Sequence, residues 1–358
     1  METTKRTVLF AALDWGLGHA TRSASLIRAA VEDGHRVHVA SSGPALAWLR
    51  ARFAGDGVTF HEKPGRAIRY ARVGTGVRIA LQMPGFLRSI GEERRWTEGC
   101  VRRHGVDRVF SDNCYGVAAE GVPSVLMTHQ VHLPVPGVLR AGARAFVRGQ
   151  AARFREVWVP DGEGERGEGR LSGRLGGPAL HPRTRFIGGL SHLPADGGTR
   201  SEWAIVGVVS GPEPLRSALE AAYRERFAGA LRAGERALIV AGRPGGGVRE
   251  DGAVMTWYSP DSAALASALK GAGRVVCRSG YSTLLDLAQI RVRAHLIPTP
   301  GQPEQELLAA HFARAFGWST SSQRAFAAGA PFPTTGQPLH LPANTEALAA
   351  LRAWLAEE

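Results

Sequence analysis

The sequence lacks long apolar runs and contains few cysteines, and both absences limit where the protein can work. No stretch approaches the ~18 consecutive apolar residues of a transmembrane helix. Residues 1–7 are polar and lead directly into a predicted strand, which is unlike a signal peptide. Cys100, Cys114 and Cys277 are odd in number, far apart and in no metal-ligand spacing. We therefore expect reduced, buried thiols and a cytoplasmic protein.

Lysine is also scarce, because almost all of the 44 basic residues are arginines, and with 32 acidic residues the net charge is +12. A GC-rich genome would explain this excess of arginine. An anionic partner, such as a nucleotide diphosphate or an acidic lipid surface, would explain it as well. Nucleic acid is not an expected partner, since the sequence contains no recognisable binding module and no basic run interleaved with aromatic residues.

What the sequence does contain is a recurring layout of strand, glycine-containing loop and helix. Its 358 residues suit two domains of ordinary size. Strands are predicted at residues 8–13, 36–41, 107–111, 123–127 and 156–159, and again at 204–209, 238–240, 253–256, 274–277 and 294–297. Helical patterns separate most of them, which is typical of an α/β fold with parallel sheets.

The two halves meet at a segment rich in glycine and proline. We predict two Rossmann-like domains with a central cleft, where the carboxyl ends of the strands bind ligands. The N-terminal domain spans residues 1–188, the linker 189–202 and the second domain 203–340. A last helix at residues 341–358 could pack back on the first domain.

The strongest site motif is VVCRSGYSTLLD at residues 275–286, where a buried strand leads into a helix. The free N–H groups and the positive dipole end of that helix would bind an anion, which Arg278 would help to neutralise and Gly280 would allow to approach closely. Asp286 could accept hydrogen bonds from a ribose diol. An ordinary strand-to-helix turn would use the same residue types. The candidates are Arg278, Ser279, Gly280, Tyr281, Ser282, Thr283 and Asp286.

Two further loops follow predicted strands. In TPGQPEQ, residues 299–305, Glu304 and Gln305 begin a helix, and a carboxylate beside an amide can pair with sugar hydroxyls. This is also a common capping arrangement. In the turn VSGP, Ser210 and Gly211 would face the β-phosphate of a diphosphate.

RSGYSTLLD followed by PTPGQPEQ resembles the donor-binding half of inverting GT-B glycosyltransferases, in particular the family 28 lipid-linked GlcNAc transferases and the UDP-glycosyltransferases. The resemblance implies that Arg278 and Gly280 contact the diphosphate, that Asp286 binds the ribose, and that Glu304 and Gln305 hold the sugar. The sequence departs from these families in lacking the asparagine that usually follows the glutamine.

Trp257 looks like the tryptophan that stacks on uracil in these families, although the spacing to the next proline is one residue longer here and a core position suits it equally. The resemblance implies a UDP-sugar as donor substrate and no cofactor. The absence of an Asp-x-Asp motif from the donor positions agrees with a site that needs no metal.

The loop DWGLGHATR after the first predicted strand carries Gly18 and His19 at the start of a helix. It lacks the complete dinucleotide-binding fingerprint. GT-B enzymes often carry Gly-His here, and the resemblance implies that His19 is the general base on the acceptor hydroxyl. An imidazole can take up a proton near neutral pH, which suits that role. His19 could instead cap the helix or contact the diphosphate.

Two other strand ends of the first half carry polar side chains. Asp112 could orient His19 or an acceptor group, and His129 could bind the acceptor. Either could equally satisfy backbone N–H groups of its own loop.

Arginines alternate with apolar residues at 66–103 and 138–155, where Arg140, Arg144 and Arg148 recur every four residues. A basic amphipathic helix is typical of membrane-surface binding, although a solvated face in an arginine-rich protein has the same pattern. With the resemblance, this pattern predicts a lipid-linked acceptor and a location at the inner face of the membrane.

The sequence therefore predicts an inverting, metal-independent glycosyltransferase. Two other functions remain open. A UDP-sugar hydrolase of nonulosonic acid biosynthesis has the same fold and a Gly-x-Gly-His-x-x-Arg loop, matched here by Gly16, Gly18, His19 and Arg22. A nucleotide-sugar-binding module without turnover would retain the same residues.

Overall fold

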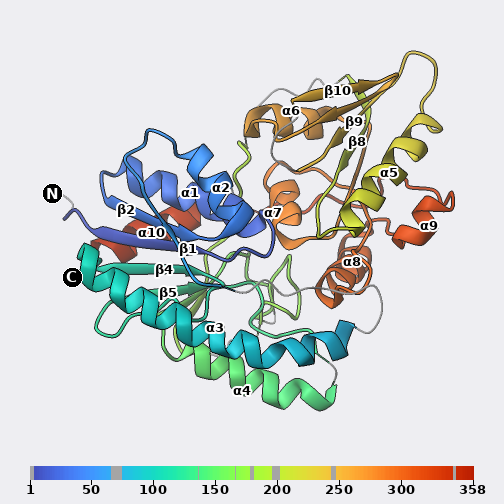
Figure 1. Ribbon diagram of the computed structural model, residues 1–358. Helices are drawn as coiled ribbons and strands as arrows, with labels where there is room; N and C mark the ends of the chain where they lie inside the picture. Colours follow the sequence, from blue (N-terminus) through green and yellow to red (C-terminus); the bar gives the residue numbers. More distant parts are fainter. Residues whose placement is uncertain are drawn as a thin grey trace. The chain divides into compact units, whose positions relative to one another are not determined.

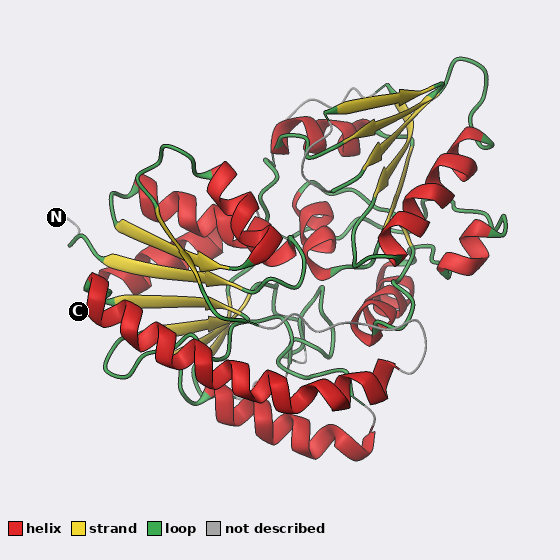
Figure 2. Ribbon diagram, viewed as in Figure 1, coloured by secondary structure: helices red, strands yellow, loops and turns green. Residues whose placement is uncertain are grey.

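The chain forms two compact units in a computed structural model, which describes residues 4–65, 75–135, 137–165, 167–177, 181–195, 202–242, 247–341 and 344–358, with the backbone alone at 75–83 (Figure 1). Unit 1 comprises Met1–Leu190 together with Pro342–Glu358, and unit 2 comprises Ser191–Leu341. Each unit is a sheet with helices on both faces (Figure 2). The predicted α/β architecture is confirmed.

Unit 1 is built on a seven-stranded sheet in the order β3-β2-β1-β4-β5-β6-β7, in which every neighbouring pair is parallel. Because the strands are parallel, all their carboxyl ends lie along one edge of the sheet. The strands are β1 (Thr7–Ala12), β2 (Arg36–Ser41), β3 (Thr59–Glu62), β4 (Arg108–Asp112), β5 (Ser124–Met127), β6 (Glu156–Val159) and β7 (Thr184–Phe186).

Helices cover both faces of this sheet, as the alternation along β1 requires. Val8 and Phe10 pack with α1 (Gly18–Glu32), α2 (Gly43–Arg52) and α10 (Thr345–Ala356), whereas Leu9 and Ala11 pack with α3 (Thr75–His104). A 3₁₀ turn, η1 (Gly137–Leu139), precedes α4 (Arg140–Ala151), whose apolar face joins that of α3. Because α10 packs on β1 together with α1 and α2, this last helix completes the core of unit 1.

Unit 2 contains a six-stranded sheet in the order β10-β11-β9-β8-β12-β13, in which only β10 is antiparallel to its neighbour among the described strands. Its strands are β8 (Trp203–Val208), β9 (Arg236–Val240), β10 (Val248–Asp251), β11 (Val254–Trp257), β12 (Arg274–Cys277) and β13 (His295–Leu296). Its helices are α5 (Leu215–Ala228), α6 (Ser262–Gly271), α7 (Tyr281–Gln289), α8 (Pro303–Phe316) and α9 (Gln323–Ala327).

The core of unit 2 depends on a glycine in the middle of β8. A Cβ at Gly207 would lie only 2.6 Å from the ring of Phe227 and 2.7 Å from that of Tyr223. The missing side chain thus lets both rings of α5 pack directly on the sheet, where they stack on each other with centroids 4.9 Å apart.

Three strands, β3, β7 and β10, were not predicted. They are short, and the side chains of β10 are all exposed, so they show neither an apolar run nor an alternation. The arginine-rich segment 66–103 lies mostly in α3, with residues 66–74 outside the described part, and residues 196–201 of the expected linker also lie outside it. None of the described helices combines the length and apolarity needed to cross a bilayer.

Candidate active site

Unit 1 brings three polar side chains together at the carboxyl ends of its central strands. Asp112 is the last residue of β4, opposite Ala12 of β1 and Met127 of β5. His19 is the second residue of α1, and His129 lies two residues beyond β5. The parallel register therefore places the predicted catalytic residues beside each other, although they are up to 110 positions apart in the sequence.

A buried arginine, Arg22, joins these residues. Its guanidinium forms a two-pronged bond with Asp112, with Nε donating to Oδ2 at 2.8 Å and Nη2 donating to Oδ1. Ser23 also donates to Oδ2, at 2.9 Å. Asp112 and Arg22 are both almost completely buried, so neither charge is screened by water. Arg22 and Asp112 therefore form a buried ion pair, not a surface one.

His19 lies against this pair with 12% of its side chain exposed. Its Nδ1 is 2.9 Å from Asp112 Oδ1 and 2.9 Å from Arg22 Nη2. A carboxylate only accepts and a guanidinium only donates, so one imidazole nitrogen can satisfy just one of the two. Because Nη2 already bonds Asp112, we assign the proton of His19 to Nδ1, donating to Asp112. Among the described residues, Nε2 of His19 has no partner.

His129 is buried on the other side of Arg22. Arg22 Nη1 lies 3.1 Å from its Nδ1 and can only donate, so Nδ1 accepts, while Nε2 of His129 lies 3.5 Å from Gln130 Nε2. The imidazole rings of His19 and His129 are 6.5 Å apart. The arrangement thus offers, in Nε2 of His19, a ring nitrogen that can accept a proton.

In unit 2, the predicted anion site follows β12 at the start of α7. Gly280 is the N-cap residue, and no side chain caps the helix. A Cβ at Gly280 would find its nearest neighbours, Gln305 Nε2 and Thr283 Oγ1, 3.9 Å away, in ordinary van der Waals contact. Tyr281 and Ser279 are buried, whereas Ser282 and Thr283 are half-buried. The backbone N–H groups, rather than the side chains of Ser279 and Tyr281, are what this turn can offer to an anion.

Arg278 occupies a different position from the one that the resemblance implies. It is fully buried, and its terminal nitrogens donate to main-chain oxygens of Ile297, Pro298 and Leu215 at 3.1–3.2 Å and to Gln323 Oε1 at 2.8 Å. Burial lowers the pKa of Arg278 to about 10, which still leaves the guanidinium charged at neutral pH. Arg278 therefore holds the surrounding loops together, and its terminal nitrogens are already occupied.

The remaining nitrogen of Arg278 faces the turn after β8. A Cβ at Gly211 would lie 3.3 Å from Thr299 Oγ1 and 4.0 Å from Arg278 Nε. Both of these atoms are buried and without a hydrogen-bond partner among the described residues. Gly211 has φ +98°, which favours glycine. Two unsatisfied donors thus lie beside a turn that has no side chain in the way, next to the uncapped end of α7.

The Gln305 side chain is hydrogen-bonded to neighbouring loops. Its Oε1 accepts from the main-chain N–H of Thr299 at 2.8 Å, its Nε2 donates to Gln302 Oε1 at 2.6 Å, and its carbonyl accepts from Ser279 Oγ at 2.7 Å. These bonds fix the start of α8 against the start of α7. Glu304, one residue earlier, is half-buried in the first turn of α8. Of the predicted pair, Glu304 is the more accessible group.

Asp286 lies on α7 with 17% of its side chain exposed. Its Oδ1 accepts from Ser191 Oγ and lies 3.4 Å from His192 Nδ1. No hydrogen bond from the described residues reaches Oδ2. The carboxylate is thus oriented through one oxygen, and the other is left for a ligand.

Trp257 ends β11 and packs at right angles against Trp203, with ring centroids 5.9 Å apart. Its Nε1 donates to Met255 Sδ at 3.2 Å. Ser210 is half-buried beside Gly211, and Gly18 is the first residue of α1. Trp257 is half-buried, and its ring is held against its own sheet.

Two residues of these clusters, Arg22 and Thr299, are not among the predicted site residues. Arg22 had a signal, since it lies one helical turn after His19 on the same face and completes the Gly-x-Gly-His-x-x-Arg loop. Thr299 had none, because its importance depends on Gly211, 88 positions earlier. Loops from distant strands meet only in the folded sheet.

No protein-family model and no curated protein matches the sequence. Solved structures do match the fold. The glycotransferase of kitacinnamycin shares 16% identity at TM-score 0.61, covering 99% of this chain and 94% of that one. Spinosyn rhamnosyltransferase SpnG complexed with thymidine diphosphate shares 15% at 0.57, covering 98% and 95%. MurG of Acinetobacter baumannii shares 14% at 0.52, covering 90% and 87%. The chain has the GT-B fold that the motifs predicted.

The buried pair of unit 1 predicts an acid-sensitive stability. Burial alone would raise the pKa of Asp112, but Arg22 and then His19 outweigh it and hold that pKa well below its ordinary value of 3.8. The carboxylate therefore contributes its full stabilisation above that value and loses it as pH falls below. Asp112→Asn should lower the free energy of unfolding of unit 1 by about 3–5 kcal/mol near neutral pH, because Arg22 loses its counter-charge.

Urea unfolding of wild type and Asp112→Asn at about pH 3 and pH 7 measures this difference, which should shrink at the lower pH. Asp33→Asn, which breaks the exposed pair between Arg352 and Asp33, serves as the control and should cost under about 1 kcal/mol. Equal stability of wild type and Asp112→Asn at both pH values would show that the pair does not hold unit 1 together.

Proposed function

We propose that the protein is an inverting glycosyltransferase in which unit 2 binds a nucleoside diphosphate sugar and unit 1 activates the acceptor hydroxyl. The observation that carries the proposal is the pair of unsatisfied donors, Arg278 Nε and Thr299 Oγ1, beside Gly211 and the uncapped start of α7. Buried donors without a partner are costly, and a phosphate oxygen is the acceptor that would satisfy them. The GT-B fold and its glycosyltransferase neighbours support the same assignment.

The donor is proposed to bind with its diphosphate over Gly211 and the start of α7. There the backbone N–H groups, the helix dipole and the buried charge of Arg278 would offset the negative charge, so no metal is needed for this purpose. Asp286 Oδ2 would accept from the ribose, and Glu304 would accept from the sugar. We propose UDP as the nucleotide from the sequence motifs. Because SpnG was solved with thymidine diphosphate, both nucleotides belong in the binding test.

The acceptor hydroxyl is proposed to lose its proton to Nε2 of His19. The hydrogen bond from Nδ1 to Asp112 would orient the ring and stabilise the imidazolium that forms. Arg22 already pairs with Asp112, which keeps the cluster from being a net anion. His129 would line the acceptor site beside this base. Departure of the nucleoside diphosphate completes the inversion in one displacement.

Donor binding should depend on Gly211 and Asp286. A methyl group in Gly211→Ala would occupy the space beside Thr299 and strain a backbone with positive φ, so we expect UDP affinity to fall at least ~10-fold. Asp286→Ala should weaken it by roughly 2–4 kcal/mol, since charge-assisted bonds to two ribose hydroxyls are lost. Calorimetry with UDP and TDP measures both. Gly252→Ala, at a positive-φ turn with open space around it, is the matched control for backbone strain. Unchanged affinity in folded Gly211→Ala would place the diphosphate elsewhere.

Turnover should depend on His19. In His19→Asn the side-chain amide can still donate to Asp112, but the group that takes the proton is gone, so kcat should fall by ~10²–10⁴ while UDP affinity stays within a few fold. A joint collapse of UDP affinity and kcat would instead assign His19 to the diphosphate. Release of UDP from each UDP-sugar should rise at least ~10-fold when an acceptor is added. Rapid release of UDP and free sugar without an acceptor would identify a hydrolase.

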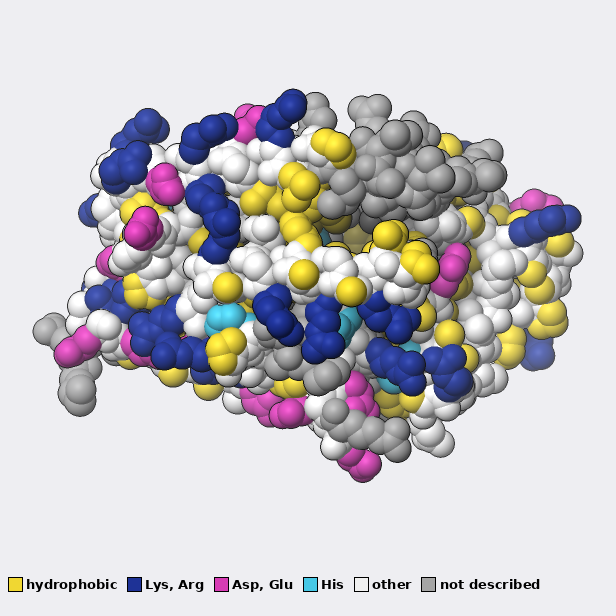
Figure 3. All heavy atoms as spheres, turned by 90° about the horizontal axis from the view of Figure 1, so that it is seen from below, with side chains coloured by type: hydrophobic (Ala, Val, Ile, Leu, Met, Phe, Trp, Pro, Cys, Tyr) yellow, Lys and Arg dark blue, Asp and Glu magenta, His cyan; other side chains and the backbone are white. Residues whose placement is uncertain are grey.

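The acceptor is proposed to be lipid-linked, because unit 1 presents a basic surface. Arg140, Arg144 and Arg148 of α4 are exposed, and Figure 3 shows arginine and lysine side chains far outnumbering acidic ones over much of this face. Phe146 is packed on Phe86 and Tyr115, so α4 has no free apolar face. The exposed apolar residues Val138 and Leu139 lie directly before α4. Attraction to an anionic membrane would therefore be mainly electrostatic, at the inner face of the membrane.

Vesicle flotation tests this surface. The protein should bind vesicles containing phosphatidylserine at low salt and dissociate at high salt, because each arginine contributes about 1 kcal/mol within a Debye length. Replacing Arg140, Arg144 and Arg148 with glutamine should abolish flotation. Replacing the exposed Arg232, Arg249 and Arg314 of unit 2 in the same way provides the control. Absence of low-salt flotation by the wild type would point to a soluble acceptor.

A further inference from the structure

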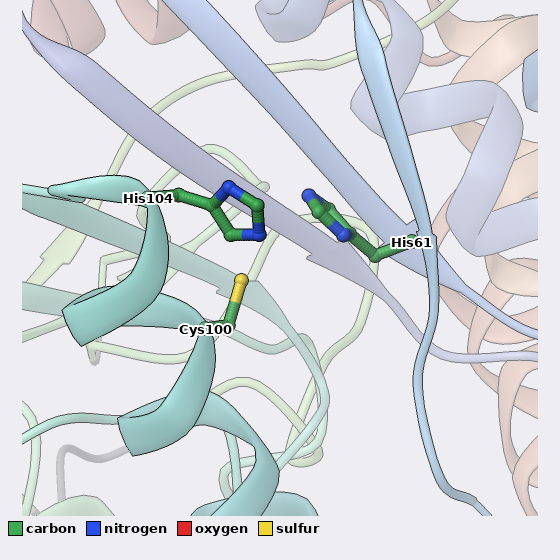
Figure 4. A group of neighbouring side chains, drawn as sticks. All are labelled: His61, Cys100 and His104. Carbon is green, nitrogen blue, oxygen red and sulfur yellow. The ribbon is translucent and has the colours of Figure 1, made fainter.

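Unit 1 contains a second cluster of reactive side chains, on the edge of the sheet away from Asp112. His61 lies on the edge strand β3, and Cys100 and His104 lie one helical turn apart on α3. Figure 4 shows the two imidazoles and the thiol turned toward one another from these two elements. One ring nitrogen of each histidine and Cys100 Sγ all lie within 4.8 Å of one another.

A fourth residue, His38 of β2, completes the surroundings. Its Nδ1 is 2.9 Å from His61 Nε2, and its ring is 5.0 Å from that of His104. The hydrogen bond holds the His61 ring in place, as outer partners of metal-binding histidines commonly do. His38 is buried, and its Nε2 has no partner in the described part of the chain. Three imidazoles and a thiol thus occupy one small volume.

We infer that His61, Cys100 and His104 form a binding site for a divalent transition-metal ion of the zinc type. One thiolate and two imidazoles are the ligands that such ions prefer, whereas magnesium and calcium require oxygen. Bond lengths of about 2.0–2.3 Å place tetrahedral ligand atoms roughly 3.3–3.8 Å apart, so atoms that lie within 4.8 Å of one another need to close by at most about 1.5 Å.

The site has an entrance. A pocket of about 190 Å³ is lined by His61, Cys100 and His104 together with Trp96 and two exposed arginines. The pocket leaves the fourth coordination position to water or to a small ligand. The cluster is distinct from the predicted catalytic residues, because two strands, β2 and β1, separate His61 on β3 from Asp112 on β4.

Two arginines line the pocket, so the ligands themselves must offset the charge of the ion. A bound metal ion displaces the proton of the Cys100 thiol, because it requires the thiolate. The thiolate then offsets part of the charge of the ion.

A metal at this position would tie the end of α3 to the edge strand of the sheet. Edge strands present unpaired backbone groups, and β3 is only four residues long. The ion would therefore act as a structural clamp on unit 1, and its loss should leave nucleotide binding by unit 2 unchanged. This inference does not rest on the proposed glycosyltransferase activity.

Cobalt titration tests the site. The full chain, freed of metal with a chelator, is titrated with Co²⁺, and we expect one equivalent to bind with a thiolate-to-cobalt charge-transfer band that zinc abolishes. Cys100→Ser should lose the band, and His104→Ala should weaken binding at least ~10-fold. His340→Ala, an exposed histidine of unit 2, should titrate like the wild type.

Thermal unfolding provides the second measurement. Zinc should raise the unfolding midpoint of unit 1 in the wild type and in His340→Ala but not in Cys100→Ser, because binding to the folded state alone stabilises it. A wild-type chain that shows no charge-transfer band, or a band that persists in Cys100→Ser, overturns the inference. A band without thermal stabilisation overturns the clamp.

Discussion

The buried bond between Arg22 and Asp112 is the interaction on which the organisation of unit 1 depends. It joins the first turns of α1 to the end of β4 and, through Arg22 Nη1, to the loop after β5. An arginine and an aspartate that are both removed from water must each satisfy the other, so the three loops have only one low-energy arrangement. That arrangement presents His19 with a defined ring orientation. The charges of Arg22 and Asp112 thus both hold the loops together and orient the ring of His19.

Unit 2 solves a similar problem with a different partner. Arg278 is buried as completely as Arg22, but it faces main-chain oxygens and a glutamine instead of a carboxylate. Neutral acceptors do not compensate the positive charge inside the unit, and burial lowers the pKa of Arg278. Arg22, which has a carboxylate partner, helps to hold the ring of His19, whereas Arg278, which has none, leaves a positive potential inside its unit. The two units therefore place the same side chain under opposite electrostatic conditions.

The sequence predicted most of the fold, because the buried parallel strands read as short apolar runs and the loops after them carry glycine. The sequence did not predict the exposed strand β10 or the edge strand β3, because neither has enough buried side chains to produce an apolar run or an alternation. For the sites, the sequence located His19 and Asp112 but not the arginine between them. It assigned Arg278 to the ligand, while the folded loops occupy most of its donors. The sequence also did not predict the cluster of Cys100 and His104 with His61. The first two lie one helical turn apart, but His61 lies on a different element and meets them only in the folded unit.

The packing of α10 has a consequence for how the chain is made. Trp354 lies among Phe110 and Trp158, so the core of unit 1 includes residues that the ribosome adds after unit 2. Unit 2 is continuous in sequence and can fold as soon as it emerges. Unit 1 begins before unit 2 and is completed after it, with the surface that α10 covers exposed throughout the synthesis of some 150 intervening residues. The order of completion is therefore the reverse of the order of synthesis, and the nascent first unit is the part of the chain that chaperones would need to protect.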